Sequence, residues 1–297
     1  MSSVDDESMP LVSMCIPVYN HERFVCASIR SVIAQSYKNI ELIVIDDGSS
    51  DSSVNVITEL LEECRERFVR FAFLTRPNAG VSATLNEGLE WSRGKYFSGL
   101  ASDDAICPDK TDVLVDHLQK NPKCLGVFGS IHLIDDNGVR TGFRKKSGVY
   151  NFRDVFLLRA EVPAPASMLR REELLKVGGF DVSTRIEDWE MWLKLTHANN
   201  SYLEVLPDLL AEYRQHPANT WKQIDLMYQE QVKIIHRYTD DPLFSRAATV
   251  LACMKFRNLS IGRKREAFMA LKKLFFCMDA YKEMRFYQGL VFLVFRW

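Results

Sequence analysis

Short apolar runs alternate with stretches of helical periodicity over the first 134 residues of the chain. The apolar run at 12–19 and the near-continuous one at 40–45 predict two strands, the second covered on both faces. Between them, apolar side chains recur at helical spacing and predict a helix over 21–35. The same alternation predicts strands at 69–74, 96–100 and 125–134, and helices at 51–65, 81–91 and 108–120.

This alternation of strands and helices predicts an α/β fold with a mostly parallel central sheet and flanking helices. In open sheets of this kind, ligands bind beyond the carboxyl ends of the strands. Two acidic pairs stand at that edge. Asp46 and Asp47 close the second predicted strand, and Asp103 and Asp104 follow the fourth. We therefore expect the functional site at this edge of the sheet.

The second half of the chain has a different pattern and a different charge. Helices are predicted at 187–198 and 226–238, and an all-helical stretch begins at 242. Residues 241–297 carry 11 basic and 4 acidic side chains, whereas residues 1–240 carry 27 basic and 35 acidic ones. Within the basic stretch, apolar side chains spaced three or four apart predict one apolar helical face, which contains Phe268, Leu271, Phe275 and Met278.

Composition excludes several classes of protein. With 47% hydrophobic and 26% charged residues, the 297-residue chain is typical of a globular protein. A net charge of −1 gives no sign of a nucleic-acid partner. Seven scattered cysteines without a CxxC pair indicate neither a disulfide framework nor a zinc cluster, and favour a reducing compartment. The polar, acidic first ten residues show no secretory signal, and no apolar run approaches the roughly 18 residues that span a bilayer.

The acidic clusters have both a structural and a functional interpretation. Asp, Ser and Gly at 46–51 are typical of a turn and a helix cap, and acids at 187–188 are favoured by the helix dipole. Alternatively, carboxylates at a strand end accept hydrogen bonds from a ribose or a base. The adjacent acids at 103–104 suit a hard divalent cation, whereas His216 alone is a weak indication of a metal ligand.

Seven sequence motifs resemble, in the same order, those of the inverting nucleotide-sugar glycosyltransferases of family 2, which have the GT-A fold. They are CIPVYN (15–20), IDDGSSD (45–51), RPNAGVSATLNEGL (76–89), ASDD (101–104), VGGFD (177–181), EDWEMWLKL (187–195) and YRQH (213–216). The resemblance covers about residues 10–220 and includes bacterial enzymes that build surface polysaccharides. It implies transfer of a sugar from a nucleoside-diphosphate sugar, which we expect to be UDP-linked. The expected acceptor is a glycan or a polyprenyl-diphosphate-linked sugar, as in O-antigen or capsule synthesis.

The resemblance also implies roles for individual residues. Asp188 matches the catalytic base, and Asp104 and His216 match ligands of a divalent metal, Mn²⁺ or Mg²⁺. Glu187 and Trp189 are expected to contact the acceptor. The residues expected to contact the nucleotide sugar are Pro17, Tyr19, Asn20, Asp46, Arg76, Asn78 and Asp103.

Pattern and resemblance together predict four regions. They are a flexible tail at 1–9, a nucleotide-sugar-binding half at 10–105, an acceptor-binding half at 106–240 and a basic amphipathic helical region at 241–297. The last region either lies on an anionic bilayer without crossing it or caps the catalytic domain. We expect a cytoplasmic enzyme that is peripheral on the inner face of the cytoplasmic membrane.

Two other activities remain open. A sugar nucleotidyltransferase also has an α/β nucleotide-binding domain, but it would show a Gly-rich phosphate loop with a basic residue, which 15–20 lacks. A non-catalytic nucleotide-sugar scaffold would not need the full set of Asp46, Asp104, Asp188 and His216. The sequence therefore favours a transferase.

Overall fold

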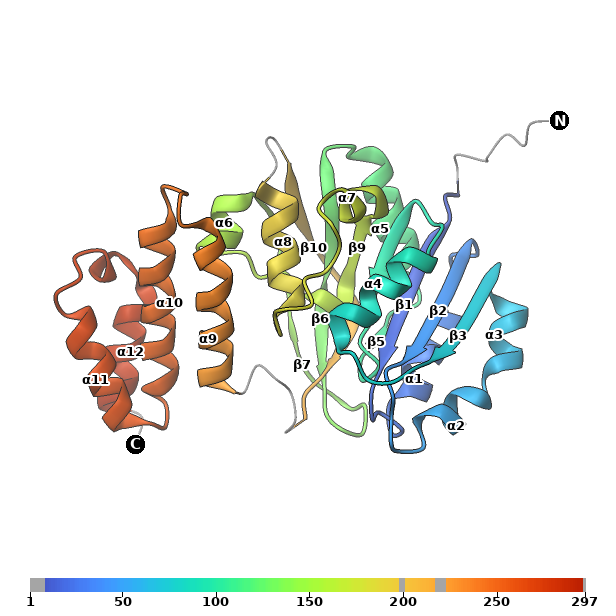
Figure 1. The fold of residues 1–297 in the computed structure, drawn as a ribbon, viewed down its shortest axis with the longest axis horizontal. Coiled ribbons are helices and arrows are strands. Elements are labelled where there is room, and N and C mark those ends of the chain that lie inside the picture. Colours follow the sequence, from blue (N-terminus) through green and yellow to red (C-terminus); the bar gives the residue numbers. More distant parts are fainter. Residues whose placement is uncertain (1–8, 198–200, 217–222, 296–297) are drawn as a thin grey trace. The chain divides into compact units, whose positions relative to one another are not determined.

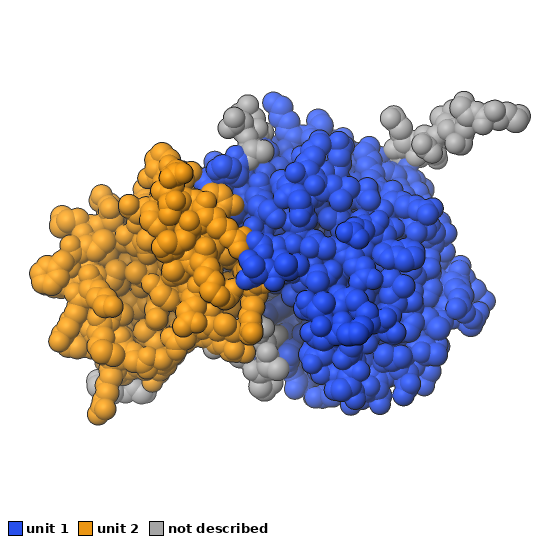
Figure 2. Space-filling view, in the orientation of Figure 1, with its two compact units in different colours: residues 1–152, 161–183, 187–216 blue, residues 153–160, 184–186, 217–297 orange. Residues whose placement is uncertain are grey.

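The computed structural model describes residues 9–197, 201–216 and 223–295, so almost all of the predicted tail at 1–9 lies outside the described part. The chain forms two compact units (Figure 2). Unit 1 contains the sheet, and unit 2 contains the C-terminal helices. Unit 1 comprises residues 1–152, 161–183 and 187–216, and unit 2 comprises residues 153–160, 184–186 and 217–297.

Unit 1 is built on one ten-stranded sheet (Figure 1). The strand order is β3-β2-β1-β4-β9-β6-β10-β5, with β7 beside β6 and β8 beside β10. The parallel pairing predicted for the first half is confirmed. It joins β1 (Val12–Val18), β2 (Ile40–Asp46), β3 (Arg70–Thr75) and β4 (Tyr96–Gly99). All seven residues of β2 are buried, as expected of a strand that is covered on both faces.

The remaining strands make the sheet mixed. They are β5 (Ala105–Ile106), β6 (Cys124–Ile134), β7 (Arg140–Arg144), β8 (Gly148–Tyr150), β9 (Ser167–Arg170) and β10 (Tyr202–Arg214). β6 and β10 pair in parallel, whereas the pairs of β5, β7, β8 and β9 are antiparallel. Of these strands the sequence pattern predicted only β6. β10 was missed because Pro207 and Asp208 are exposed in its middle, where the pairing register shifts and the apolar alternation is lost.

Helices flank this sheet, and four of them lie close to their predicted positions, namely α1 (Val25–Ile33), α4 (Val81–Trp91), α5 (Lys110–Lys120) and α8 (Glu187–His197). The other helices of unit 1 are α2 (Ser53–Thr58), α3 (Leu61–Arg67) and α7 (Arg171–Lys176), whereas all but the first residue of α6 (Phe152–Phe156) belongs to unit 2. The single helix predicted over 51–65 is wrong, because the segment forms α2 and α3. The Leu60 N–H bonds to the carbonyl of Ile57 at 2.9 Å in a tighter turn, and the Leu60 side chain is buried.

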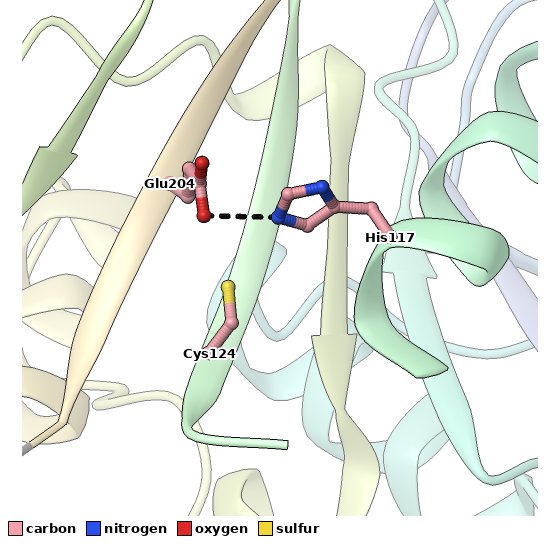
Figure 3. Close-up of side chains that lie close together, drawn as sticks. All are labelled: His117, Cys124 and Glu204. Carbon is pink, nitrogen blue, oxygen red and sulfur yellow. Dashed lines mark hydrogen bonds and ion pairs between the residues drawn. The ribbon is translucent and has the colours of Figure 1, made fainter. Parts of the chain in front are cut away.

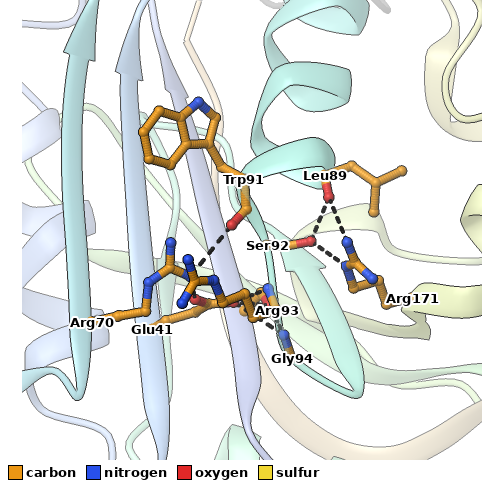
Figure 4. Close-up of polar contacts among 9 residues, drawn as sticks. Glu41, Arg70, Leu89, Trp91, Ser92, Arg93, Gly94 and Arg171 are labelled. Carbon is orange, nitrogen blue, oxygen red and sulfur yellow. Dashed lines mark hydrogen bonds and ion pairs between the residues drawn. The ribbon is translucent and has the colours of Figure 1, made fainter.

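A buried carboxylate fastens the amino ends of the first strands (Figure 4). Glu41, near the start of β2, is 1% exposed and accepts hydrogen bonds from the Ser13 hydroxyl at 2.5 Å and the Gly94 N–H at 3.1 Å. It also accepts the Arg93 N–H at 2.5 Å and pairs with Arg70. A Cβ on Gly94 would lie 2.7 Å from the Ser13 nitrogen, so only glycine permits this approach. Glu41 therefore joins β1, β2, β3 and the turn before β4.

Unit 2 is helical, which confirms the all-helical stretch predicted from 242. Its main helices are α9 (Ile224–Ile235), α10 (Phe244–Leu259), α11 (Lys264–Leu274) and α12 (Met284–Phe295). Phe256 and Phe286 belong to a core that α10, α11 and α12 share. A Cβ on Gly289 would lie 2.5 Å from the Phe256 ring, so α12 lies very close to α10. Within the described residues, no helix has the length and apolar character that crossing a bilayer requires.

Candidate active site

Three loops meet at the carboxyl ends of β1, β2 and β3. The Asn20 N–H donates to the Ser49 hydroxyl at 2.9 Å, and its side-chain oxygen accepts the Ser50 N–H at 2.8 Å. Asn20 has a φ of +53°, a conformation that asparagine tolerates better than most residues. Gly48 has a φ of +74°, and a Cβ there would lie 2.8 Å from the Asn78 nitrogen. The predicted nucleotide-binding loops are therefore joined by short polar contacts.

Asp46 and Asp47 have different roles at the end of β2. The Oδ2 atom of Asp46 accepts the Ser49 N–H at 3.0 Å, whereas its Oδ1 atom is buried and has no hydrogen-bond partner among the described residues. Asp47 instead accepts the N–H groups of Ala79 and Gly80 at 2.8 and 2.9 Å. An unpaired buried acceptor costs about 1–3 kcal/mol. Asp47 thus holds the neighbouring loop, and Asp46 keeps an acceptor available to a ligand.

The Arg76 guanidinium is bonded within the protein. It pairs with Asp47, with Glu87 at 2.7 Å and with the Thr84 hydroxyl at 2.7 Å. These bonds fix the loop that follows β3. The contact between Arg76 and the nucleotide stays a prediction.

The other predicted nucleotide contacts lie on the same loops. Tyr19 is 50% exposed directly after β1, and Asn78 is exposed on the loop after β3. Pro17, near the carboxyl end of β1, lines a cavity that is also lined by Asp104 and Asp188. Their side chains are therefore placed where a ligand at this edge would lie.

Asp104 and His216, the two predicted metal ligands, are each bonded at the acidic loop that follows β4. His216 Nε2 lies 2.9 Å from Asp103 Oδ2, and Asp104 Oδ1 accepts the Arg214 N–H at 2.8 Å. Arg214 also donates from Nε to the Asp103 carbonyl at 2.7 Å. Burial, and then repulsion from Asp103, raises the pKa of Asp104 well above its usual range. The end of β10 is thus bonded to the acidic loop after β4.

Sequence reasoning missed several residues around His216. Its ring stacks on Phe24 with 5.8 Å between centroids, and the His21 ring lies 6.4 Å away. His21 Nδ1 lies 2.7 Å from the Ser102 hydroxyl, and burial lowers the pKa of His21. His21 directly follows the CIPVYN motif, and Arg214 lies within YRQH. Adjacency to a motif was therefore the signal that could have found them.

Glu187 and Asp188, which open α8, line a cavity of about 180 Å³. Asp104 and apolar side chains such as Leu85 and Trp192 line it as well. Burial, and then repulsion from Asp188, raises the pKa of Glu187 to about 7. Burial also raises the pKa of Asp188. A carboxylate with a raised pKa is a better proton acceptor near neutral pH.

The two tryptophans of α8 differ in position. Trp189 is 9% exposed and is not among the residues that line the cavity. Trp192 lines the cavity, and its ring packs edge-on against Phe128 with 4.9 Å between centroids. The contact of Trp189 with an acceptor stays a prediction, and Trp192 is the aromatic side chain that the structure places at the cavity.

A second cluster lies at the opposite edge of the sheet (Figure 3). One set of three His, Cys, Asp or Glu side chains in the described part of the chain has its possible metal-ligand atoms within 4.8 Å of one another. It consists of His117, Cys124 and Glu204. His117 Nε2 and Glu204 are 2.9 Å apart, and the Cys124 thiol donates to the Gly126 carbonyl at 3.2 Å. Burial raises the pKa of that thiol to about 12. His117 and Glu204 pair with one another and Cys124 bonds to the backbone, so we assign the cluster a structural role.

Comparisons with known proteins find relatives that are named as glycosyltransferases. An uncharacterized glycosyltransferase of Rickettsia bellii is 31% identical over 228 residues, which cover 74% of this chain and 32% of that protein. One of Rickettsia typhi is 29% identical over 218 residues, which cover 71% of this chain and 66% of that protein. The matched residues thus span 32% and 66% of the length of these two relatives.

Similar solved structures show the fold. Staphylococcus aureus TarS 1–349 in complex with UDP-GlcNAc has a TM-score of 0.65 at 17% identity, over 89% of this chain and 80% of that one. The mannosyltransferase PcManGT of Pyrobaculum calidifontis, in complex with GDP-Man and Mn²⁺, has a TM-score of 0.66 at 16% identity, over 95% and 80%. The predicted GT-A fold is confirmed. The family described as "Glycosyl transferase family 2" matches residues 13–177, which are more than half of the chain. The chain therefore belongs to glycosyl transferase family 2.

Proposed function

We propose that this chain transfers a sugar from a UDP-linked donor to a glycan or lipid-linked acceptor, with inversion at the anomeric carbon. The observation that carries the proposal is the set of carboxylates at the carboxyl ends of the strands. One oxygen of Asp46 has no partner among the described residues, and Asp104 and Asp188 line one cavity. The nucleotide sugars bound by TarS and PcManGT support a donor of this class.

The nucleotide would lie across the loops that follow β1 and β2. The free Oδ1 of Asp46 can accept a hydrogen bond from a base N–H or a ribose hydroxyl. The contacts of Asn20 with Ser49 and Ser50 hold the two loops in place before the ligand arrives. Such pre-organisation lowers the entropy cost of binding.

The acidic loop has a donor set that suits a divalent metal. Asp104 and His216, with Asp103 bonded to His216, offer carboxylate oxygen and imidazole nitrogen, which Mn²⁺ and Mg²⁺ accept. Burial, and then repulsion from Asp103, raises the pKa of Asp104, and a cation would relieve that repulsion. A cation held there would supply positive charge to a leaving diphosphate. We expect EDTA to abolish transfer and Mn²⁺ or Mg²⁺ to restore it, whereas full activity in chelator would contradict this role.

We propose that Asp188 acts as the base. In a single displacement, an acceptor hydroxyl attacks the anomeric carbon from the face opposite the diphosphate and gives up its proton as the new bond forms. Asp188 would take that proton, with Glu187 as its neighbour in the cavity. The apolar wall around Leu85 and Trp192 limits water, which would otherwise hydrolyse the donor.

We also propose a role in bacterial surface polysaccharide synthesis, such as O-antigen or capsule assembly. A polyprenyl-diphosphate-linked acceptor lies in a membrane, so the proposal includes a peripheral position on the inner face of the cytoplasmic membrane.

A donor panel tests this function. The full chain is incubated with UDP-, GDP- and dTDP-sugars and a mixture of acceptor glycans, and nucleotide release and the anomeric configuration of the product are measured. We expect acceptor-dependent release of UDP and an inverted linkage. Release of pyrophosphate from a nucleoside triphosphate and a sugar phosphate would indicate a nucleotidyltransferase instead. Donor binding without turnover would indicate a scaffold.

A further inference from the structure

Unit 2 exposes many large apolar side chains on α11, the turn after it and α12. Twelve of the 22 exposed large hydrophobic residues in the described chain lie within 261–295. Phe276 is 88% exposed, and Met278 and Phe295 are each 78% exposed. We call the exposed apolar side chains from Phe268 to Phe295 the α11–α12 surface. Contiguous apolar areas on a protein surface mark sites of interaction.

The helices that carry this surface are apolar on two sides. Their inner sides are already used, because Ala267 and Leu274 of α11 and Phe286 of α12 are buried in the core of unit 2. The outer sides are therefore not needed to form the core of unit 2.

Hydrogen bonds link α11 and α12 near their ends. The Lys264 ammonium donates to the Phe292 carbonyl at 2.5 Å, which places the start of α11 beside the end of α12. At the opposite ends, the Tyr281 hydroxyl donates to the Phe275 carbonyl at 2.6 Å, and the Tyr287 hydroxyl donates to the Tyr281 carbonyl at 2.9 Å. The two helices thus run antiparallel and are connected at both ends.

The α11–α12 surface also carries basic side chains without acidic partners. Arg265, Lys272 and Lys273 are exposed, and no acidic group of the described chain lies within ion-pair distance of them. Arg265, Lys272 and Phe268 share one side of α11 by their spacing of three and four residues. The Lys272 ammonium lies 5.3 Å from the centre of the Phe268 ring. Cations next to aromatic rings are typical of the boundary between membrane and water.

We propose that the α11–α12 surface binds an anionic lipid bilayer and lies in its interface without crossing it. The basic side chains would meet lipid phosphates, and the exposed rings and methionines would enter the boundary with the acyl chains. A second copy of the chain fits less well, because a two-fold contact would bring the unpaired cations against one another. The lipid-linked acceptor of the proposed function gives this surface its purpose, and in that respect the inference rests on that function.

Vesicle flotation with the full chain tests the surface without donor or acceptor. We expect the protein to float with vesicles of phosphatidylglycerol and phosphatidylcholine at low salt, but not at high salt and not with phosphatidylcholine alone. Lys272→Gln with Lys273→Gln should weaken partitioning about 30-fold. Phe276→Ser with Met278→Ser should weaken it at least about tenfold, also at low salt.

Matched variants in unit 1 provide the controls. Phe143→Ser removes an apolar side chain that is 65% exposed, and Lys38→Gln with Lys123→Gln removes two exposed charges. Both should float like the unaltered protein, and all variants should keep its melting temperature. Nucleotide release with a soluble acceptor is measured separately, so loss of binding and loss of transfer are distinguished.

Three results would overturn the inference. One is that the unaltered protein fails to float with anionic vesicles at low salt. Another is that the unit 2 variants and the unit 1 controls float equally. The third is that the protein is a dimer that Phe276→Ser with Met278→Ser makes monomeric without any vesicle binding in either form, since the surface would then be a self-association interface.

Discussion

The two ends of β2 carry buried carboxylates with opposite environments. Glu41, near its amino end, accepts three hydrogen bonds and pairs with Arg70. Asp46, at its carboxyl end, is equally buried, yet its Oδ1 atom has no partner among the described residues. A fully bonded carboxylate stabilises a fold, whereas one with an unused acceptor costs free energy until a ligand donates to it. The contrast separates structural acids from functional ones on a single strand.

The same contrast holds for the two edges of the sheet. At the amino edge, Glu204 is paired with His117. At the carboxyl edge, Asp104, Glu187 and Asp188 lie together around one cavity, and burial raises the pKa of each of them. Buried carboxylates with raised pKa values that share one cavity are typical of binding and catalytic sites.

The largest expected effect is on turnover. Asp188→Asn removes the proton acceptor in the cavity and should cut turnover at least about a hundredfold while donor affinity stays nearly unchanged. The measurement is steady-state nucleotide release together with donor titration. Asp208→Asn, an exposed acid on β10, is the control and should keep full turnover. Near-normal turnover of the Asp188→Asn variant would show that Asp188 is not the base.

The next effect compares the two ends of β2 directly. Glu41→Gln leaves Arg70 and the two N–H donors with a neutral partner, and should lower the free energy of unfolding by about 3 kcal/mol. Asp46→Asn should leave stability unchanged or raise it, because it removes an unsatisfied charge. Chemical denaturation measures both variants. Equal destabilisation by the two substitutions would contradict the division into structural and functional acids.

A buried lysine at the start of α5 should produce a smaller, pH-dependent effect on stability. Lys110 is fully buried, its ammonium donates to the Ser98 hydroxyl at 2.6 Å, and burial lowers its pKa to about 7. Between this value and the usual pKa, the unfolded chain binds a proton that the folded chain does not, so stability rises with pH.

Relative to Lys110→Met, the unaltered protein should therefore gain about 2 kcal/mol of stability between pH 7 and pH 9. Denaturation curves at both pH values measure the difference. A difference between the two proteins that does not change with pH would show that Lys110 is charged when folded.

The smallest effect concerns the pH profile of the site. Glu187, with a pKa raised to about 7, should titrate near neutral pH and produce a step in turnover there. In Glu187→Gln that step should disappear. A step near pH 7 that persists in the variant would assign the titration to another group.

The sequence predicted the parallel half of the sheet well, because each of its strands is a compact apolar run between helices of regular period. It predicted the antiparallel half poorly. β10 lost its pattern at Pro207 and Asp208, and β5, β7, β8 and β9 are each five residues or fewer. Strands that short carry too few positions for an alternating pattern to be distinctive.

The sequence motifs located the candidate site, but the hydrogen-bond partners seen in the structure were needed to assign a role to each residue. Asp46 and Asp47 are adjacent and chemically identical. Only the structure shows that the Asp47 carboxylate accepts hydrogen bonds from the Ala79 and Gly80 N–H groups. The predicted apolar helical face runs beyond α11, which ends at Leu274, before Phe275 and Met278. Leu271 packs against the core of unit 2, whereas Phe268 is 53% and Phe275 is 60% exposed. Helical spacing alone does not tell which of two apolar sides is buried.

Nucleotide binding tests the central claim most directly, namely that the carboxyl end of β2 receives the donor. The unaltered protein, Asp46→Asn and Glu41→Gln are titrated calorimetrically with whichever of UDP, GDP and dTDP the unaltered protein binds. A hydrogen bond to a charged acceptor is worth about 1.5–3 kcal/mol, so Asp46→Asn should lose at least about tenfold in affinity, and Glu41→Gln should bind normally while it is folded. Unchanged affinity in Asp46→Asn, or a loss confined to Glu41→Gln, would contradict the account.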